Sequence, residues 1–218
     1  MDKSIILRVL WQAAGETLYM VGVSVVAAQI LGLPLGVLLV ITDDGHILEN
    51  KVINRILSTI INIGRSIPFI ILLVAIIPLT KFLLGTYIGT TATIVPLTVA
   101  AIPFVARVVE STLKEVDPGV VEAAQAMGAS PWQIVYKVLL PESLPGLVLG
   151  FTLTAVNLIG YSAMAGTVGG GGLGDIAIRF GYQRYRVDII LYTVIILVVL
   201  VQVLQALGNL LARRLARR

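Results

Sequence analysis

Residues 117–145 read Asp-Pro-Gly-Val-Val-Glu-Ala-Ala-Gln-Ala-Met-Gly-Ala-Ser-Pro-Trp-Gln-Ile-Val-Tyr-Lys-Val-Leu-Leu-Pro-Glu-Ser-Leu-Pro, a polar stretch inside an otherwise almost wholly apolar chain. The stretch contains two helix starts, of which Asp117 gives the first. Asp117 can cap a helix that begins at Pro118, because a carboxylate accepts from free amide groups and proline suits the first helical position. Gly128 can end this helix, because glycine readily adopts the left-handed conformation of a C-terminal cap.

The second helix start follows two residues later. Ser130 can cap a helix with Pro131 at its first position, and Gln133 completes a Ser-x-x-Gln capping box. The stretch therefore predicts a helical hairpin within a loop of about residues 110–143. A helical hairpin between membrane spans is typical of a docking site for another protein.

The composition indicates an integral membrane protein. Of the 218 residues, 57% are hydrophobic and only 13% are charged, whereas about a quarter are charged in a soluble domain. The chain has no cysteine, which excludes disulfides and thiolate metal sites. The net charge of +4 comes largely from an arginine-rich C-terminal tail, which indicates a cytoplasmic orientation signal rather than a nucleic-acid-binding arm.

Five apolar segments are long enough to cross a hydrocarbon core about 30 Å thick as helices. The predicted spans are residues 17–41, 57–79, 92–109, 144–168 and 187–211. Residues 4–14 are too short to span, and their apolar face predicts a separate helix on the membrane surface. The fold class is therefore all-α integral membrane, as one domain of residues 1–218, with the cytoplasmic hairpin between spans three and four.

The distribution of basic residues predicts the orientation of these spans. With the C-terminus inside, the inside segments carry nine basic residues: Lys51, Arg55, Arg107, Lys114, Lys137, Arg213, Arg214, Arg217 and Arg218. The outside segments carry six: Lys3, Arg8, Lys81, Arg179, Arg184 and Arg186. Because cytoplasmic loops carry the excess of Lys and Arg, we expect the N-terminus outside, the C-terminus in the cytoplasm and the hairpin in the cytoplasm.

No enzymatic site is predicted. The glycine run at residues 169–174 lacks the Gly-Lys-Ser/Thr of a phosphate loop, so we interpret it as a tight re-entrant turn. The only histidine, His46, lies in a polar loop on the opposite side of the membrane from Ser162, which leaves that serine without a base. No catalytic residue and no metal site is predicted. The absence of a carboxylate well inside a span argues against a proton-coupled transporter.

Four residues are candidates for the translocation pathway or its gate. Arg65 is the one cation within an apolar run; it either snorkels to the interface or contacts the pathway. Tyr161, Ser162 and Met164 fall in the outer half of the fourth span, between Gly160 and Gly166. Met164 is flexible enough to seal a pore and repack, or it simply fills a gap in the core.

The first hairpin helix carries a stripe of small and apolar residues at helical spacing. We expect this stripe to dock into a groove of another protein, although a helix folded back onto its own bundle is the alternative. The predicted docking residues are Val120, Glu122, Ala123, Ala124, Met127 and Gly128.

These motifs resemble a known family. Glu122-Ala123-Ala124 with Gly128, and the Leu-Leu-Pro at residues 139–141, resemble the EAA loop of ABC importer permeases. The stretches at residues 64–70 and 160–185, including Gly160-Tyr161-Ser162-Ala163-Met164, resemble the methionine branch of that family.

The resemblance implies a mechanism and a set of partners. Two copies of the permease would pair with two ABC ATPase subunits in the cytoplasmic membrane of a prokaryote, and an extracytoplasmic binding protein would deliver methionine. The EAA loop would couple ATP hydrolysis to alternating access, with ATP and Mg²⁺ bound by the ATPase, so this chain would bind no cofactor. The lipid bilayer is a further partner, and nucleic acid is not.

Other functions remain open on the sequence. The nearest is an ABC permease for another amino acid or small molecule. A secondary transporter or channel, and an assembly factor that uses the loop only for docking, are the other two.

Overall fold

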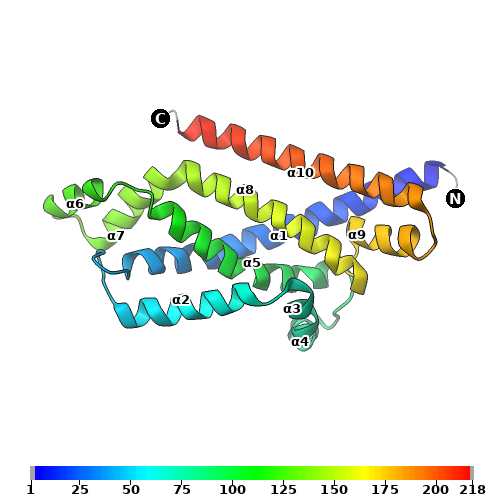
Figure 1. The fold of residues 1–218 in the computed structure, drawn as a ribbon, viewed down its shortest axis with the longest axis horizontal. Coiled ribbons are helices and arrows are strands. Elements are labelled where there is room, and N and C mark those ends of the chain that lie inside the picture. The colour runs from blue at the N-terminus through cyan, green and yellow to red at the C-terminus, as the bar shows by residue number, and fades with distance from the viewer. Residues whose placement is uncertain (1–2, 217–218) are drawn as a thin grey trace.

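The computed structural model describes residues 3–216, so Arg217 and Arg218 of the basic tail lie outside the described residues. All regular structure in the described range is helical (Figure 1). The α-helices are α1 (Lys3–Ile41), α2 (Lys51–Ser66), α3 (Phe69–Ala75), α4 (Ile77–Leu84), α5 (Thr90–Leu113), α6 (Pro118–Ala126), α7 (Pro131–Ile134), α8 (Leu140–Ala165), α9 (Gly172–Ile176) and α10 (Val187–Leu215).

The first helix corrects one prediction. Instead of a surface helix at residues 4–14 followed by a separate span, α1 is a single helix of 39 residues, about 58 Å long. The first turns of α1 pack against the rest of the chain, because Ile6 and Leu10 are buried in a cluster with Leu173 of α9 and Ile189 of α10. The side of this segment that carries Ile6 and Leu10 therefore packs on α9 and α10 of the same chain.

The centre of the fold is the pairing of α1 with α5, the most extensive helix contact in the structure. A Cβ at Gly32 would lie 2.8 Å from the Cβ of Val105, and a Cβ at Gly36 would lie 2.5 Å from the Cβ of Val109. The two helices therefore approach closely because the GxxxG pair of α1 carries no side chains at the contact.

The predicted second span is not one straight helix. The chain breaks between α2 and α3, and the two axes differ by 99°. Ile67 is extended with φ −82° and ψ 121°, as expected for a residue that precedes a proline, here Pro68. Within residues 3–216, four helices are long and apolar enough to cross a membrane, or five if this bent pair is one span.

The hairpin differs from the prediction at its second helix. From Pro131 the chain is helical without interruption to Val168, through a π-helical turn at Val135–Leu139. The fourth span therefore begins inside the predicted loop, and only residues 114–130 lie between α5 and this long helix. Figure 1 shows α6 and the C-terminal end of α10 at one end of the bundle, with the N-terminus and α9 at the other.

Candidate coupling surface and translocation pathway

The first hairpin helix forms as its caps predict. The side chain of Asp117 accepts a hydrogen bond from the amide of Gly119 at 2.8 Å, and α6 begins at Pro118. Helix α6 ends at Ala126 with Met127 as its C-cap, and the next residue, Gly128, adopts φ +80°. The reversal of the chain after α6 therefore depends on a left-handed residue, the conformation that favours glycine.

The predicted capping box is also present. The Ser130 hydroxyl accepts from the amide of Gln133 at 3.4 Å, and the Gln133 side chain accepts from the amide of Ser130 at 2.8 Å. These two bonds fix where the second helix begins, and so fix its position relative to α6.

The predicted docking stripe is divided between two faces. Ala124 is buried and belongs to the main core, so its assignment to the outer face is corrected. Val121, which was not predicted, is half-buried against the same core. Val120, Ala123 and Met127 are exposed, and Met127 is 82% exposed. The helix thus rests on its own bundle through Val121 and Ala124 and presents the opposite face outward.

Two aromatic residues of this surface were missed by the sequence reasoning. Trp132 is 79% exposed, and Tyr136, one helical turn further, is exposed as well. Their i, i+4 spacing places them on one helix face. Large aromatic side chains so exposed in a polar segment favour a protein interface, and this signal was present in the sequence.

A polar network joins α2 to the second half of α5. The Arg107 guanidinium donates to the Ser58 hydroxyl and, at 2.9 Å, to Asn62 Oδ1, both of α2. It also pairs with Glu110, whose other carboxylate oxygen accepts from Lys114 at 2.9 Å. Glu110 is buried. Because α5 extends one turn past the predicted end of the third span at Val109, this carboxylate lies just outside the predicted span, near the C-terminal end of the helix.

The network continues toward α6 through the polar loop at residues 42–50. Lys114 Nζ lies 2.7 Å from Asp43 Oδ2, and its hydrogen bond lowers the pKa of Asp43. His46 and Lys114 line a cavity of about 360 Å³ together with Glu122 and Gln125 of α6. Burial lowers the pKa of His46, and its buried Nδ1 has no hydrogen-bond partner in the described residues.

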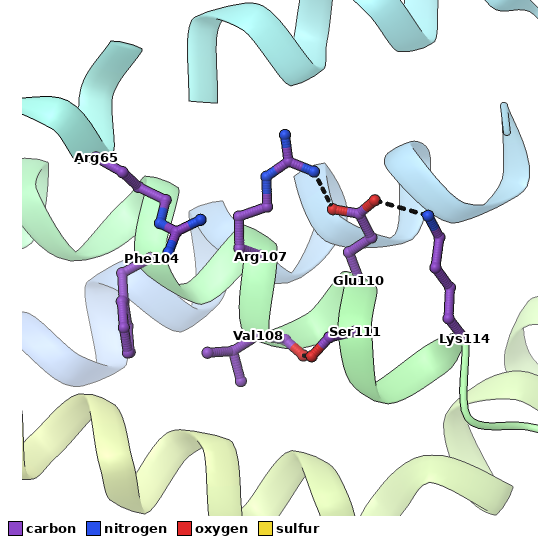
Figure 2. Close-up of a pocket in the computed structure, with 7 residues that line it drawn as sticks. All are labelled: Arg65, Phe104, Arg107, Val108, Glu110, Ser111 and Lys114. Atoms are coloured by element: carbon purple, nitrogen blue, oxygen red, sulfur yellow. Dashed lines mark hydrogen bonds and ion pairs between the residues drawn. The ribbon is translucent and has the colours of Figure 1, made fainter. Parts of the chain in front are cut away.

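Arg65 lies at the C-terminal end of α2, beside the face of α5 that carries Arg107 and Glu110. A cavity of about 390 Å³ is lined by Arg65, Phe104, Arg107, Val108, Glu110, Ser111 and Lys114. In Figure 2, Arg65 reaches from α2 toward Phe104 of α5, and the pairs of Glu110 with Arg107 and Lys114 are drawn as dashed lines. Polar and charged side chains from two helices therefore gather around this cavity.

The three candidate gate residues of α8 have different surroundings. Tyr161 stacks on Phe69 of α3. Ser162 is buried, and its hydroxyl donates to the Ile159 carbonyl at 2.7 Å, so it does not reach the chain surface. Met164 is 49% exposed and is therefore not a core residue of this subunit. None of these residues lines the cavity that contains Arg65.

The glycine run forms a tight turn at the other end of the bundle. Gly169, Gly171 and Gly172 all have positive φ, between 71° and 81°. The turn is held by the helices around it: the Gly172 amide donates to the Glu16 carboxylate and the Leu173 amide to the Thr17 hydroxyl, each at 2.9 Å. The run is thus a backbone turn clamped by α1.

Known proteins are similar to this chain in sequence. Residues 19–218 match the family described as binding-protein-dependent transport system inner membrane component. The Vibrio cholerae protein named "Probable D-methionine transport system permease protein MetI" is 55% identical over 218 residues, covering all of this chain and 95% of that protein. The "Methionine import system permease protein MetP" of Bacillus subtilis is 42% identical over 209 residues, covering 96% of this chain and 94% of that one.

A solved structure is similar to this chain in its fold as well. A chain of the structure described as "Inward facing conformations of the MetNI methionine ABC transporter: CY5 native crystal form" superposes with a TM-score of 0.96 at 49% sequence identity. The match covers 99% of each chain.

Proposed function

Because this chain belongs to the family of binding-protein-dependent transport system inner membrane components, we propose that it is the membrane-spanning permease subunit of an ATP-driven methionine importer. The observation that carries the proposal is the TM-score of 0.96, at 49% identity over 99% of both chains, with a subunit of a methionine ABC transporter. Two relatives named for methionine transport or import, 55% and 42% identical, support the same substrate.

The proposed assembly contains two copies of this chain and two ABC ATPase subunits. The ATPase supplies the ATP and Mg²⁺ site, and an extracytoplasmic binding protein delivers methionine to the outer face. The chain is a multi-pass protein of the cytoplasmic membrane, with α6 and the C-terminus in the cytoplasm and the N-terminus outside. Helix α6 and the last turns of α10 lie at the same end of the bundle (Figure 1). This arrangement supports the orientation, because it places Arg213 and Arg214 on the cytoplasmic side together with α6.

The outward face of the coupling loop is the proposed contact with the ATPase. Val120, Glu122 and Ala123 present a small, partly acidic surface, and Met127 extends beyond it. Trp132 and Tyr136 continue this surface on the second helix. Because Ala124 and Val121 pack on the core of the chain, a displacement of α6 by the ATPase is transmitted to the bundle.

The alternating-access cycle follows from this arrangement. The ATPase moves α6, and residues 42–50 and Lys114 connect the surroundings of α6 to the polar network of α5 and α2. Binding protein and ATP need only favour one arrangement of the helices over the other by a few kcal/mol.

Measurement of ATP hydrolysis by the purified components tests this proposal. The chain alone should hydrolyse no ATP, and its complex with its ABC ATPase partner should hydrolyse ATP faster when methionine-loaded binding protein is added. Glu122→Lys should reduce copurification of the ATPase, with Glu115→Lys outside α6 as the matched charge control. ATP hydrolysis by the chain alone, free of contaminant, would overturn the proposal.

A further inference from the structure

The cavity beside Arg65 has the charge of a site for an anionic group. Its lining contains three cationic side chains, Arg65, Arg107 and Lys114, and one carboxylate, Glu110, which together give a net charge of +2. Its volume of about 390 Å³ lies within the range of roughly 300–1,000 Å³ that is usual for small-molecule sites. A concave surface with an excess of positive charge concentrates anions.

Only one of the three cations is free to bind a ligand. Arg107 is held by Glu110 and by Ser58 and Asn62 of α2. Lys114 is held between Glu110 and Asp43. Arg65 is exposed and makes no hydrogen bond or ion pair with any residue of the range 3–216. Its planar guanidinium can donate two parallel hydrogen bonds to a carboxylate.

The side of the cavity that α5 forms is apolar near Arg65 and becomes polar further along the helix. Phe104 and Val108 stand one turn apart on the same face of α5, and Phe104 lies next to the Arg65 side chain in Figure 2. Ser111 follows one turn later, and its hydroxyl oxygen can accept a hydrogen bond from an ammonium group. A thioether packs favourably against an aromatic ring.

The cavity lies on the side of the bundle from which a solute would leave. Lys114 lines this cavity and also the cavity that borders α6, so both lie at the end of α5 that faces the coupling loop. In the proposed orientation this is the cytoplasmic end.

We propose that this cavity is an exit-side binding site for the transported amino acid, in which Arg65 binds the carboxylate and Phe104 and Val108 contact the apolar side chain. The site rests on the proposed function and adds to it a place where the solute is held before release. Ser111 is the proposed acceptor for the ammonium group.

Photo-crosslinking in the assembled transporter tests the site. The whole complex is labelled with photo-methionine, which carries a diazirine in the side chain, and the labelled peptide is identified by mass spectrometry. The expected label lies on the peptide that contains Phe104 and Val108. Free methionine should compete with the label, whereas methioninol, which lacks the carboxylate, should compete at least tenfold less well.

Two arginine variants provide the matched comparison. Arg65→Gln should reduce the label at this peptide at least tenfold. Arg55→Gln, which removes another exposed arginine of α2 outside this cavity, should leave the label unchanged. In both variants the ATPase should copurify and be stimulated by loaded binding protein, which shows that the complex is intact. Equal labelling in Arg65→Gln and wild type, or equal competition by methioninol, would overturn the site.

The same preparation distinguishes this inference from the proposed function. If wild-type proteoliposomes import methionine while the label falls outside the cavity, only the exit-side site is wrong. If the wild type imports no methionine, the proposed function is wrong, and the substrate assigned to the cavity is wrong with it.

Discussion

Phe69 and Tyr161 stack face to face, with ring centroids 4.7 Å apart and planes inclined by only 2°. The contact joins α3, directly after the 99° break, to the second half of α8. Stacked aromatic pairs contribute about 0.5–1.5 kcal/mol beyond the area they bury. The pair therefore fixes the bent segment against α8, at a point three residues before Met164.

Replacement of Met164 by alanine tests whether this part of α8 gates the pathway. Because Met164 is 49% exposed in the subunit, its truncation should leave the complex folded and should raise basal ATP hydrolysis or passive methionine flux. The measurements are thermal unfolding of the purified complex and methionine leakage from loaded proteoliposomes. Leu158→Ala is the control on the same helix, since Leu158 is buried and its truncation should cost about 2–5 kcal/mol. Lowered stability with unchanged coupling in Met164→Ala would contradict the gate.

Gly128 tests the geometry of the coupling loop. A Cβ at this position would meet no atom within 4 Å, so a substitution is opposed only by the backbone φ of +80°. We expect Gly128→Val to cost about 1–2 kcal/mol locally, to misdirect α6 and to abolish stimulation of ATP hydrolysis, while the membrane helices still fold. Gly128→Asn should retain most of the stimulation, because asparagine tolerates the left-handed region. Full stimulation in Gly128→Val would show that the turn does not need this conformation.

Gly36 tests the close packing of α1 on α5. A Cβ at Gly36 would lie 2.5 Å from the Cβ of Val109 and 2.6 Å from the carbonyl oxygen of Ala106. Gly36→Ala should therefore force the helices apart and cost about 1–3 kcal/mol, measured as a lower melting temperature. Gly22→Ala on the same helix meets nothing within 4 Å and should be neutral or stabilising. Equal melting temperatures for the two variants would contradict this account of the contact.

His46 should make stability depend on pH. Burial lowers its pKa below the ordinary value of 6.5, so the folded protein binds the proton less tightly than the unfolded chain does. The stability is therefore fully present above about pH 6.5 and decreases as the pH falls through 6.5 toward the folded pKa. The melting temperature of the wild type should fall between about pH 7.5 and 5.5, and that of His46→Gln should fall less. The same pH dependence in both proteins would exclude His46 as its source.

The features that sequence could predict are those set by neighbours in the chain. The caps at Asp117 and Ser130 and the positive φ of Gly128 need only local hydrogen bonds and steric freedom, and the structure confirms all three. The break near Pro68 interrupts a segment that was predicted as one span, although its cause is local too, because proline restricts the residue before it.

The features that sequence missed depend on distant contacts. The first turns of α1 were assigned to the membrane surface because their partners, Leu173 and Ile189, lie far along the chain. Ala124 belongs to an apolar stripe that periodicity cannot divide between the core and the docking face. Glu110 has the sequence context of an exposed helix end, and only Arg107 and Lys114 in the folded chain show why it is buried.

Methionine uptake into proteoliposomes tests the central claim most directly. The vesicles contain this chain with its ATPase, the methionine-loaded binding protein is outside, and ATP is enclosed with the ATPase on the inner side. The account predicts that labelled methionine accumulates against its gradient only when ATP, ATPase and this chain are all present, and that other amino acids accumulate far less. Accumulation without the ATPase, or ATP hydrolysis stimulated by the loaded binding protein with no methionine entering, would contradict it.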